Sequence, residues 1–239
     1  MEKAIIFDFD DTLVYTNDIF NNAKDRFYDL MFELNLADER LADVLNHLDI
    51  ANVKKAGGLA KDCFPNALRQ TYLYYCRKKN QQADLKIAEL CADIGWQVYE
   101  ITPVIVPGAE ELLKELSAHY KLYMMTQGDK KTQKERMEKS GLLRYFDDYK
   151  IVKAKKQFHY MQLITKKSIK KEASWSVGNS LRSDINPALL AGLKAIHVQV
   201  DCWDYESAAS IGGYHQTKDL LSCRNILLDN IPHDKEVIL

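Results

Sequence analysis

The chain has 239 residues and a formal net charge of −1, with 46% hydrophobic and 28% charged residues. This length predicts one ordinary domain with a large insertion, or two modest domains. The balanced charge gives no reason to expect a nucleic acid or an anionic membrane as partner. Five scattered cysteines without metal-site spacing predict free thiols. With no signal peptide and no apolar run of ~20 residues, we expect a cytoplasmic protein without membrane segments.

The first predicted element is a short apolar strand at residues 4–7, which runs into an acidic turn. Residues 15–102 contain no convincing strand and repeat apolar side chains at helical spacing, for example Ile19, Ala23 and Phe27. Gly57-Gly58 and Pro65 interrupt this stretch. It therefore predicts a bundle of four or five helical pieces.

From residue 103 onward the pattern alternates between helices and strands. Helices are predicted at 109–119, 130–140, 157–167 and 187–191, and strands at 121–126, 149–152, 174–177 and 195–200. Strands separated by single helices favour parallel pairing with right-handed crossovers. The predicted fold class is α/β, with a doubly wound, Rossmann-like parallel-sheet core domain (1–14 and 103–239). An all-helical cap domain (15–102) is expected between hinges near 16–17 and 102–107.

Two carboxylates stand where the first strand ends, in Asp8-Phe9-Asp10-Asp11-Thr12. Ligands of open α/β sheets gather at the carboxyl ends of strands, and residues two apart on a strand share one side. Asp8 and Asp10 are therefore expected to approach one centre, where Mg²⁺ would relieve their mutual repulsion. The pair offers a nucleophile and a proton donor. An acidic turn that only caps a helix is the alternative interpretation.

This turn resembles the first motif of the haloacid dehalogenase-like hydrolase superfamily, Asp-x-Asp-x-Thr/Val. The resemblance implies that Asp8 is the nucleophile and Asp10 the general acid/base. Thr126 matches the family's second motif, a Thr or Ser that ends the next strand of the sheet. By this resemblance Thr126 and the backbone N–H of Gln127 would bind the phosphoryl oxygens, and Gly128 would let the backbone approach them closely.

The family's third motif is a lysine that neutralises the nucleophile and the phosphate. Lys153, Lys155 and Lys156 are the candidates. In relatives the lysine often stands five residues before an aromatic side chain that packs the following helix. Tyr160, which continues into an apolar helical face, selects Lys155 as the catalytic and phosphate-binding lysine. Phe158 would instead select Lys153, so Lys153 and Lys156 stay open as alternatives.

Residues 178–184, Gly-Asn-Ser-Leu-Arg-Ser-Asp, resemble the family's fourth motif, Gly-Asp/Asn-Ser-x-x-x-Asp. The resemblance implies that Asp184 is the third protein ligand of Mg²⁺, with Asp8 and the backbone carbonyl of Asp10. Asn179 is expected to hold a water or to support a ligand. Helix capping is the alternative use of this loop, but Asn186 can cap the next helix by itself.

The helical insertion resembles the cap of the subgroup that contains phosphoglycolate phosphatase-like enzymes. The resemblance implies Mg²⁺-dependent hydrolysis of a small-molecule phosphate ester through an aspartyl-phosphate on Asp8. Asp10 argues against dehalogenation, because a halide leaves without a proton and the dehalogenases of the family lack Asp at this position. A sugar-phosphate mutase and a non-catalytic binding protein are the alternatives. We expect a monomer or a weak homodimer.

Substrate specificity is expected on the helical insertion, where the sequence is least informative. Its aromatic side chains favour a core role over a substrate platform: Tyr72, Tyr74, Tyr75, Trp96 and Tyr99. A few polar or turn residues are candidates for the cleft, although each fits a surface or turn role better: Tyr15, Asn17, Gly57-Gly58, Lys61 and Arg69, with Trp203 and Asp204 beyond the last predicted strand.

Overall fold

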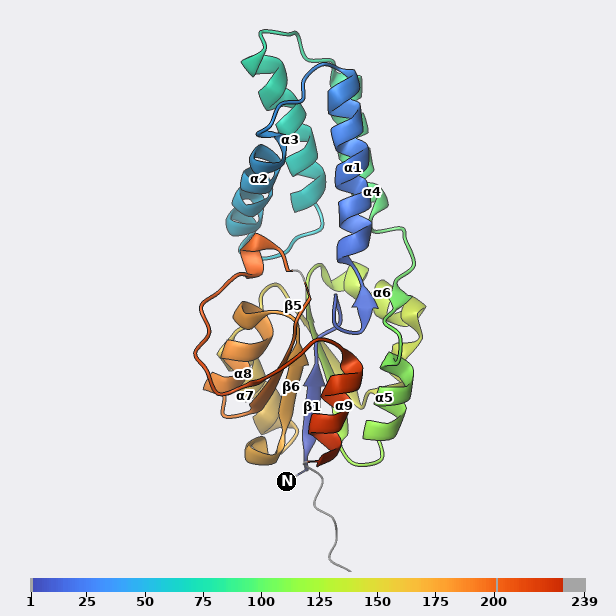
Figure 1. Ribbon diagram of the computed structural model, residues 1–239, viewed down its shortest axis with the longest axis vertical. Coiled ribbons are helices and arrows are strands. Elements are labelled where there is room, and N and C mark those ends of the chain that lie inside the picture. The colour runs from blue at the N-terminus through green and yellow to red at the C-terminus, as the bar shows by residue number, and fades with distance from the viewer. Residues whose placement is uncertain (1, 201, 230–239) are drawn as a thin grey trace, which may run out of the picture.

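A computed structural model describes residues 2–200 and 202–229 of the chain. Six strands form one sheet in the order β5-β4-β1-β6-β7-β8, and each neighbouring pair is parallel (Figure 1). The predicted α/β class with a parallel, doubly wound sheet is therefore confirmed. The strands are β1 (Ala4–Phe7), β4 (Lys121–Gln127), β5 (Asp148–Val152), β6 (Trp175–Gly178), β7 (Lys194–Val198) and β8 (His215–Thr217).

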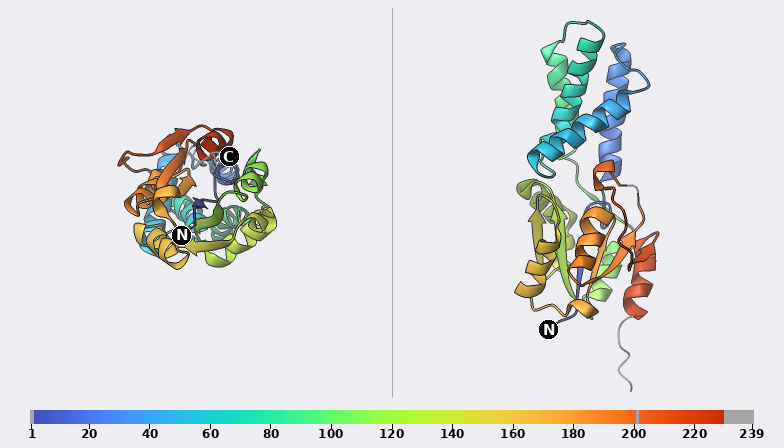
Figure 2. Two further views of the ribbon diagram at one scale, coloured as in Figure 1. Left: turned by 90° about the horizontal axis from the view of Figure 1, so that it is seen from below. Right: turned by 90° about the vertical axis from the view of Figure 1, so that its left-hand side faces the viewer.

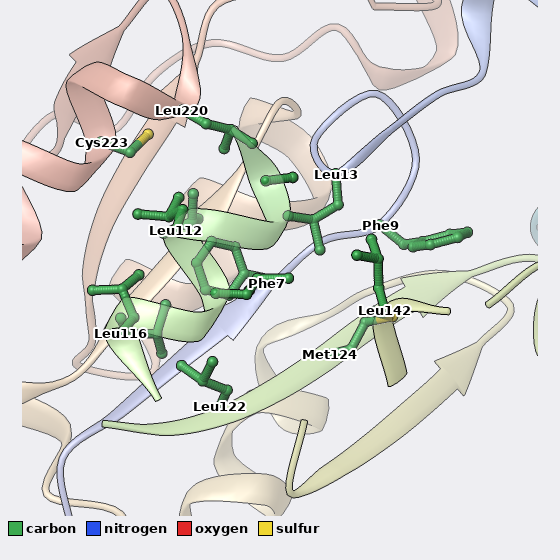
Figure 3. Packing of buried hydrophobic residues seen from close by; sticks show 14 of the residues in the cluster. Phe7, Phe9, Leu13, Leu112, Leu116, Leu122, Met124, Leu142, Leu220 and Cys223 are labelled. Atoms are coloured by element: carbon green, nitrogen blue, oxygen red, sulfur yellow. The ribbon is translucent and has the colours of Figure 1, made fainter. Parts of the chain in front are cut away.

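Helices cover both faces of the sheet, which explains why its central strand β1 is apolar throughout. On one face Ile5 and Phe7 of β1 pack with side chains of α5, α6 and α9 (Figure 3). On the other face Ala4 and Ile6 pack with α7 and α8. The helices are α5 (Ala109–Leu116), α6 (Lys130–Ser140), α7 (Gln157–Lys166), α8 (Asn186–Leu190) and α9 (Leu220–Asp229), with short helical turns at Leu142–Tyr145, Lys171–Ala173, Leu181–Ile185 and Asp204–Glu206.

The sequence did not reveal the last two elements, β8 and α9. β8 has three residues, His-Gln-Thr, of which two are exposed, so it carries no apolar alternation that would mark a strand. It is placed by pairing with β7, from Ile196↔His215 to Val198↔Thr217. The predicted strand 195–200 also ends two residues early, at Val198.

Four helices lie within residues 15–102, the range predicted as the cap: α1 (Asn17–Glu33), α2 (Leu41–Ala56), α3 (Cys63–Lys78) and α4 (Leu85–Gln97). They stand beyond the carboxyl edge of the sheet (Figure 2) and bury a hydrophobic cluster of their own, which includes Phe27, Leu45 and Tyr75. None of the helices within 2–200 and 202–229 combines the length and apolar character needed to cross a bilayer. That this region forms a separate domain stays a prediction.

The chain enters and leaves this helical region at one place. β2 (Val14–Tyr15) precedes α1, and β3 (Val104–Ile105) follows α4. The two pair antiparallel, with Val14 opposite Ile105 and Tyr15 opposite Val104. Both crossings between sheet and helices are therefore held in a single two-stranded ribbon, within or next to the two predicted hinges.

Helices α3 and α4 approach each other closely at Gly95. A Cβ atom added there would lie 2.7 Å from the Cα of Pro65 and 3.2 Å from Cδ1 of Leu68. The nearer atom belongs to the backbone and cannot rotate away. The close helix pair thus depends on the absence of a side chain at this position.

Gly95→Ala is expected to lower the free energy of unfolding by about 1–2 kcal/mol, although alanine is the better helix former. Urea unfolding followed by circular dichroism measures this effect. Gln97→Ala, at an exposed position of the same helix, is the control and should change the free energy by less than about 0.5 kcal/mol. A stabilised Gly95→Ala variant would contradict the close-packing argument.

Candidate active site

A cavity of about 130 Å³ lies between the carboxyl edge of the sheet and the helices α1 to α3, with Val98 and Tyr99 from the segment after α4. The loops that follow β1, β4, β5, β6 and β7 all contribute to its wall, because the carboxyl ends of parallel strands meet at one edge. Most of the residues predicted for the site line this cavity: Asp8, Asp10, Gln127, Gly128, Lys155, Asn179 and Asp184. Thr126 does not.

The side chain of Lys155 bridges two carboxylates at the floor of the cavity. Its Nζ donates to Oδ1 of Asp8 and lies 2.5 Å from Oδ1 of Asp184. All three side chains are buried, with Lys155 only 2% exposed. Lys153 and Lys156 are exposed. Of the three candidate lysines, Lys155 is the one placed against the carboxylates, and its catalytic role stays a prediction.

Burial and crowded charge shift the proton affinities in this cluster. Burial raises the pKa of Asp8 well above its ordinary value, and the charge of Asp184 raises it further. Burial also raises the pKa of Asp184. For Lys155, burial opposes the charged form, but Asp184 and Asp8 outweigh it and raise the pKa. One ammonium thus faces two carboxylates, which leaves an excess of negative charge.

The carboxylate of Asp10 belongs to a second cluster, built on α6. Arg136 Nη1 donates to Oδ1 of Asp10, and Gln133 Nε2 lies 2.6 Å from Oδ2. The hydroxyl of Thr16 donates to Oδ1 at 2.7 Å. Burial opposes the charge on Asp10, yet Arg136 and these hydrogen bonds outweigh it and lower the pKa. Asp10 is therefore held as a carboxylate in this arrangement.

The side chains of Thr126 and Gln127, in the second motif, form hydrogen bonds with other protein side chains. The hydroxyl of Thr126 is fully buried and accepts a hydrogen bond from Gln133 Nε2 at 2.7 Å. The side chain of Gln127 donates to Glu206 Oε1 at 2.6 Å and accepts from the backbone N of Lys155 at 3.0 Å. Gly128 has a φ of 140°, which favours glycine in this turn. Phosphate binding by these residues stays a prediction.

Sequence reasoning missed several residues of the site, among them Gln133, Arg136 and Glu206. Glu206 is 8% exposed and also accepts hydrogen bonds from the hydroxyls of Ser180 and Ser183, at 2.6 and 2.5 Å. Nothing in its loop sequence marks it. Helix α6 did carry a signal, because its sequence is very polar. Its buried side chains at i, i+3 spacing, Gln133 and Arg136, therefore had to face polar groups and not a hydrophobic core.

The candidates for the helical side of the cleft divide into two groups. Asn17, Lys61 and Trp203 line the cavity, as does Tyr99, for which a core role was predicted. Trp203 packs against Phe20 of α1 with ring centroids 5.0 Å apart. The remaining candidates are not part of the cavity wall: Tyr15, Gly57, Gly58, Arg69 and Asp204.

The donors of the Asp8–Asp184 cluster fit a hard divalent cation. They are carboxylate oxygens, the ligand type that Mg²⁺ prefers, and their excess negative charge favours a cation. Within residues 2–200 and 202–229, no three His, Cys, Asp or Glu side chains converge closely enough to form a metal site. The ligand role expected for the Asp10 carbonyl stays a prediction.

The sequence model of the family described as "Haloacid dehalogenase-like hydrolase" matches residues 5–198, which include all of these site residues except Trp203 and Glu206. The chain belongs to this family. The resemblance that the four motifs suggested is thereby confirmed. No curated protein sequence matches the chain significantly.

Solved structures share the fold at low sequence identity. A haloacid dehalogenase-like family hydrolase from Xanthomonas campestris is 20% identical, with 96% of each chain covered and a TM-score of 0.77. The putative hydrolase YfnB from Bacillus subtilis, bound to magnesium, is 20% identical, with 95% and 98% covered and a TM-score of 0.63. A predicted phosphoglycolate phosphatase from Haemophilus somnus is 18% identical, with 94% and 97% covered and a TM-score of 0.64. L-2-haloacid dehalogenase from Xanthobacter autotrophicus also matches, at 15% identity, 95% and 99% coverage and a TM-score of 0.63. These likenesses show the fold.

Lys155→Met is expected to lower the free energy of unfolding by about 3–5 kcal/mol in metal-free buffer, because two buried carboxylates lose their cation. Urea unfolding in the presence of EDTA measures the change, and added Mg²⁺ should restore part of it by binding the same carboxylates. Lys153→Met, which removes an exposed ammonium, is the matched control and should change stability by less than about 0.5 kcal/mol. Equal losses in the two variants would argue against the bridging role of Lys155.

Proposed function

We propose that this hydrolase is a Mg²⁺-dependent phosphatase that acts on a small phosphomonoester. The observation that carries the proposal is the position of Asp10 beside the Asp8–Lys155–Asp184 cluster in one cavity. A phosphate ester releases an alcohol, which needs a proton, whereas a halide leaves without one. A partly buried second carboxylate near the nucleophile therefore favours phosphate esters over haloacids.

Each group has a defined part in the proposed reaction. Asp8 attacks phosphorus in line, and the alcohol leaves as Asp10 gives it a proton. Lys155 offsets the negative charge of the transferred group, as electrostatic stabilisation in a water-poor site requires. A Mg²⁺ ion bound by Asp8, Asp184 and the carbonyl of Asp10 would polarise the phosphoryl oxygens. Water then hydrolyses the aspartyl-phosphate, with Asp10 as the base.

Asp10 must take up a proton from water when the substrate binds. In the described state Arg136 holds Asp10 ionised, which suits the base of the second step and not the acid of the first. A phosphate dianion that enters the cavity would draw the guanidinium of Arg136 and repel the carboxylate of Asp10. Both effects raise the proton affinity of Asp10 when a proton is needed.

Phosphate release from a panel of phosphomonoesters, with and without Mg²⁺, tests the proposal. Wild type should release phosphate only with the metal, and Asp8→Asn should reduce kcat by at least about 10³-fold because the nucleophile is lost. Asp25→Asn, an exposed acid on α1, is the matched control and should keep wild-type turnover.

Other outcomes point to other functions. If folded wild type releases no phosphate from any ester, the phosphatase proposal fails. Isomerisation of a sugar phosphate that requires a bisphosphate activator would then favour the mutase, and chloride release from 2-chloro acids would favour a dehalogenase. Absence of all three activities would favour a binding protein.

A further inference from the structure

The helical wall of the cavity carries the groups that the alcohol part of a substrate would meet. If phosphorus lies at Asp8, as in the proposed function on which this inference rests, the alcohol must extend toward α1, α2 and the start of α3. Aromatic side chains make up much of this wall: Phe20, Phe64, Tyr99 and Trp203. Its charged members are Asp49 and Lys61.

Asp49, on α2, is a carboxylate without a full set of partners. Its Oδ1 is buried and has no hydrogen-bond partner in the described part of the chain. Burial raises the pKa of Asp49 to about 6, while the charge of Lys24 on α1 lowers it. Lys24 itself is directed to Asn21, at an exposed site. An unsatisfied buried carboxylate oxygen is costly to a fold. A function that needs this oxygen free would explain why it is there.

The other acidic side chains of the cavity all have partners. Asp8 and Asp184 share Lys155, and Asp10 binds Arg136. Asp11 accepts from the backbone N–H groups of Thr16 and Asn17, Asp129 caps α6 through the N–H of Thr132, and Glu206 accepts from Gln127, Ser180 and Ser183. Asp49 therefore stands apart from the remaining cavity acids in having a buried oxygen without a hydrogen-bond partner in the described part of the chain.

The charge balance of the cavity determines what kind of group Asp49 suits. Among the described lining residues, seven are acidic (Asp8, Asp10, Asp11, Asp49, Asp129, Asp184 and Glu206) and three are basic (Lys61, Arg136 and Lys155). A divalent cation and a phosphate dianion cancel each other, so the bound substrate does not change this excess. A leaving group with a further negative charge is repelled here, and one with a positive charge is attracted.

We propose that the substrate is the phosphomonoester of a small amino alcohol, whose ammonium group binds Asp49. The aromatic rings beside Asp49 suit a cation, because the face of a ring attracts positive charge. The cavity, at about 130 Å³, accommodates an alcohol with a short chain. The phosphate and ammonium ends of such an ester would meet the sheet and helix walls respectively.

Lys61 supplies the rival interpretation. Its Nζ lies over the rings of Trp96 and Tyr99, 5.7 and 5.4 Å from their centroids, and its charge helps lower the pKa of Asp129. It does not approach a carboxylate within ion-pair distance in the described part of the chain. A carboxylate-bearing ester would use Lys61 and leave Asp49 unpaired, so the preference between amine and carboxylate distinguishes the two interpretations.

Three esters of similar size distinguish an ammonium site at Asp49 from a carboxylate site at Lys61. They are O-phosphoethanolamine with an amine, n-propyl phosphate without a second charged group, and 2-phosphoglycolate with a carboxylate. We expect kcat/KM for the amine ester to exceed that for the neutral ester by at least about 10-fold, as a charged hydrogen bond provides, with the carboxylate ester the poorest. Asp49→Asn should reduce the ratio of amine to neutral ester by about 10-fold or more, mainly through KM. Asp93→Asn, an exposed acid on α4 outside the cavity, should leave the ratio unchanged.

Binding to the Asp8→Asn variant keeps this inference separate from the proposed function. Calorimetry should give tighter binding for the amine ester than for the neutral one, and Asp49→Asn in that background should remove the difference. If no ester is hydrolysed but this difference holds, the phosphatase proposal fails and the subsite stands. The subsite is overturned if the protein does not prefer the amine ester in hydrolysis or in binding, or if it prefers the carboxylate ester. It is also overturned if Asp49→Asn leaves the ratio between the amine ester and the neutral ester unchanged.

Discussion

The ammonium of Lys155 between Asp8 and Asp184 is the interaction on which the rest of the site depends. The three residues come from the loops after β5, β1 and β6, and they draw these loops into one buried cluster. Taking three charges out of water is costly, and only close pairing offsets the cost. The backbone adapts to this pairing at Gly178, where a Cβ atom would overlap the carboxylate of Asp184. The N–H of Ser180 further holds that carboxylate, at 3.0 Å.

Asp8 and Asp10 are two residues apart, yet they lie in opposite electrostatic environments. Asp8 shares one cation with another carboxylate, and its pKa is raised. Asp10 is paired with the guanidinium of Arg136, and its pKa is lowered. The roles proposed for them, a nucleophile and an acid, need the reverse order of proton affinities. A cation bound at Asp8 and Asp184 would lower the pKa of Asp8, and a nearby phosphate would raise the pKa of Asp10. The reactive state of the pair would thus depend on bound ligands and not on the protein alone.

Much of this architecture was predictable, because it rests on short-range patterns. The apolar strand before Asp8, the helical period of residues 15–102 and the alternation after residue 103 each predict their element, and family motifs placed Asp8, Asp10, Lys155 and Asp184 in one site. The partners of Asp10 were not predictable in this way, since Arg136 and Gln133 lie more than 120 residues further along the chain and carry no motif. Likewise, β8 owes its strand conformation to pairing with β7 and not to its own residues.

The ribbon of β2 and β3 has an evolutionary consequence. Because the two ends of the helical region are paired there, its 88 residues can be regarded as an insertion that is connected to the sheet at a single place. An insertion of this kind can be exchanged, lengthened or changed in shape without altering the strand order of the sheet. The residues at the strand ends and the helices that cover them can thus diversify at different rates. One site on the sheet could then be combined with many different helical regions.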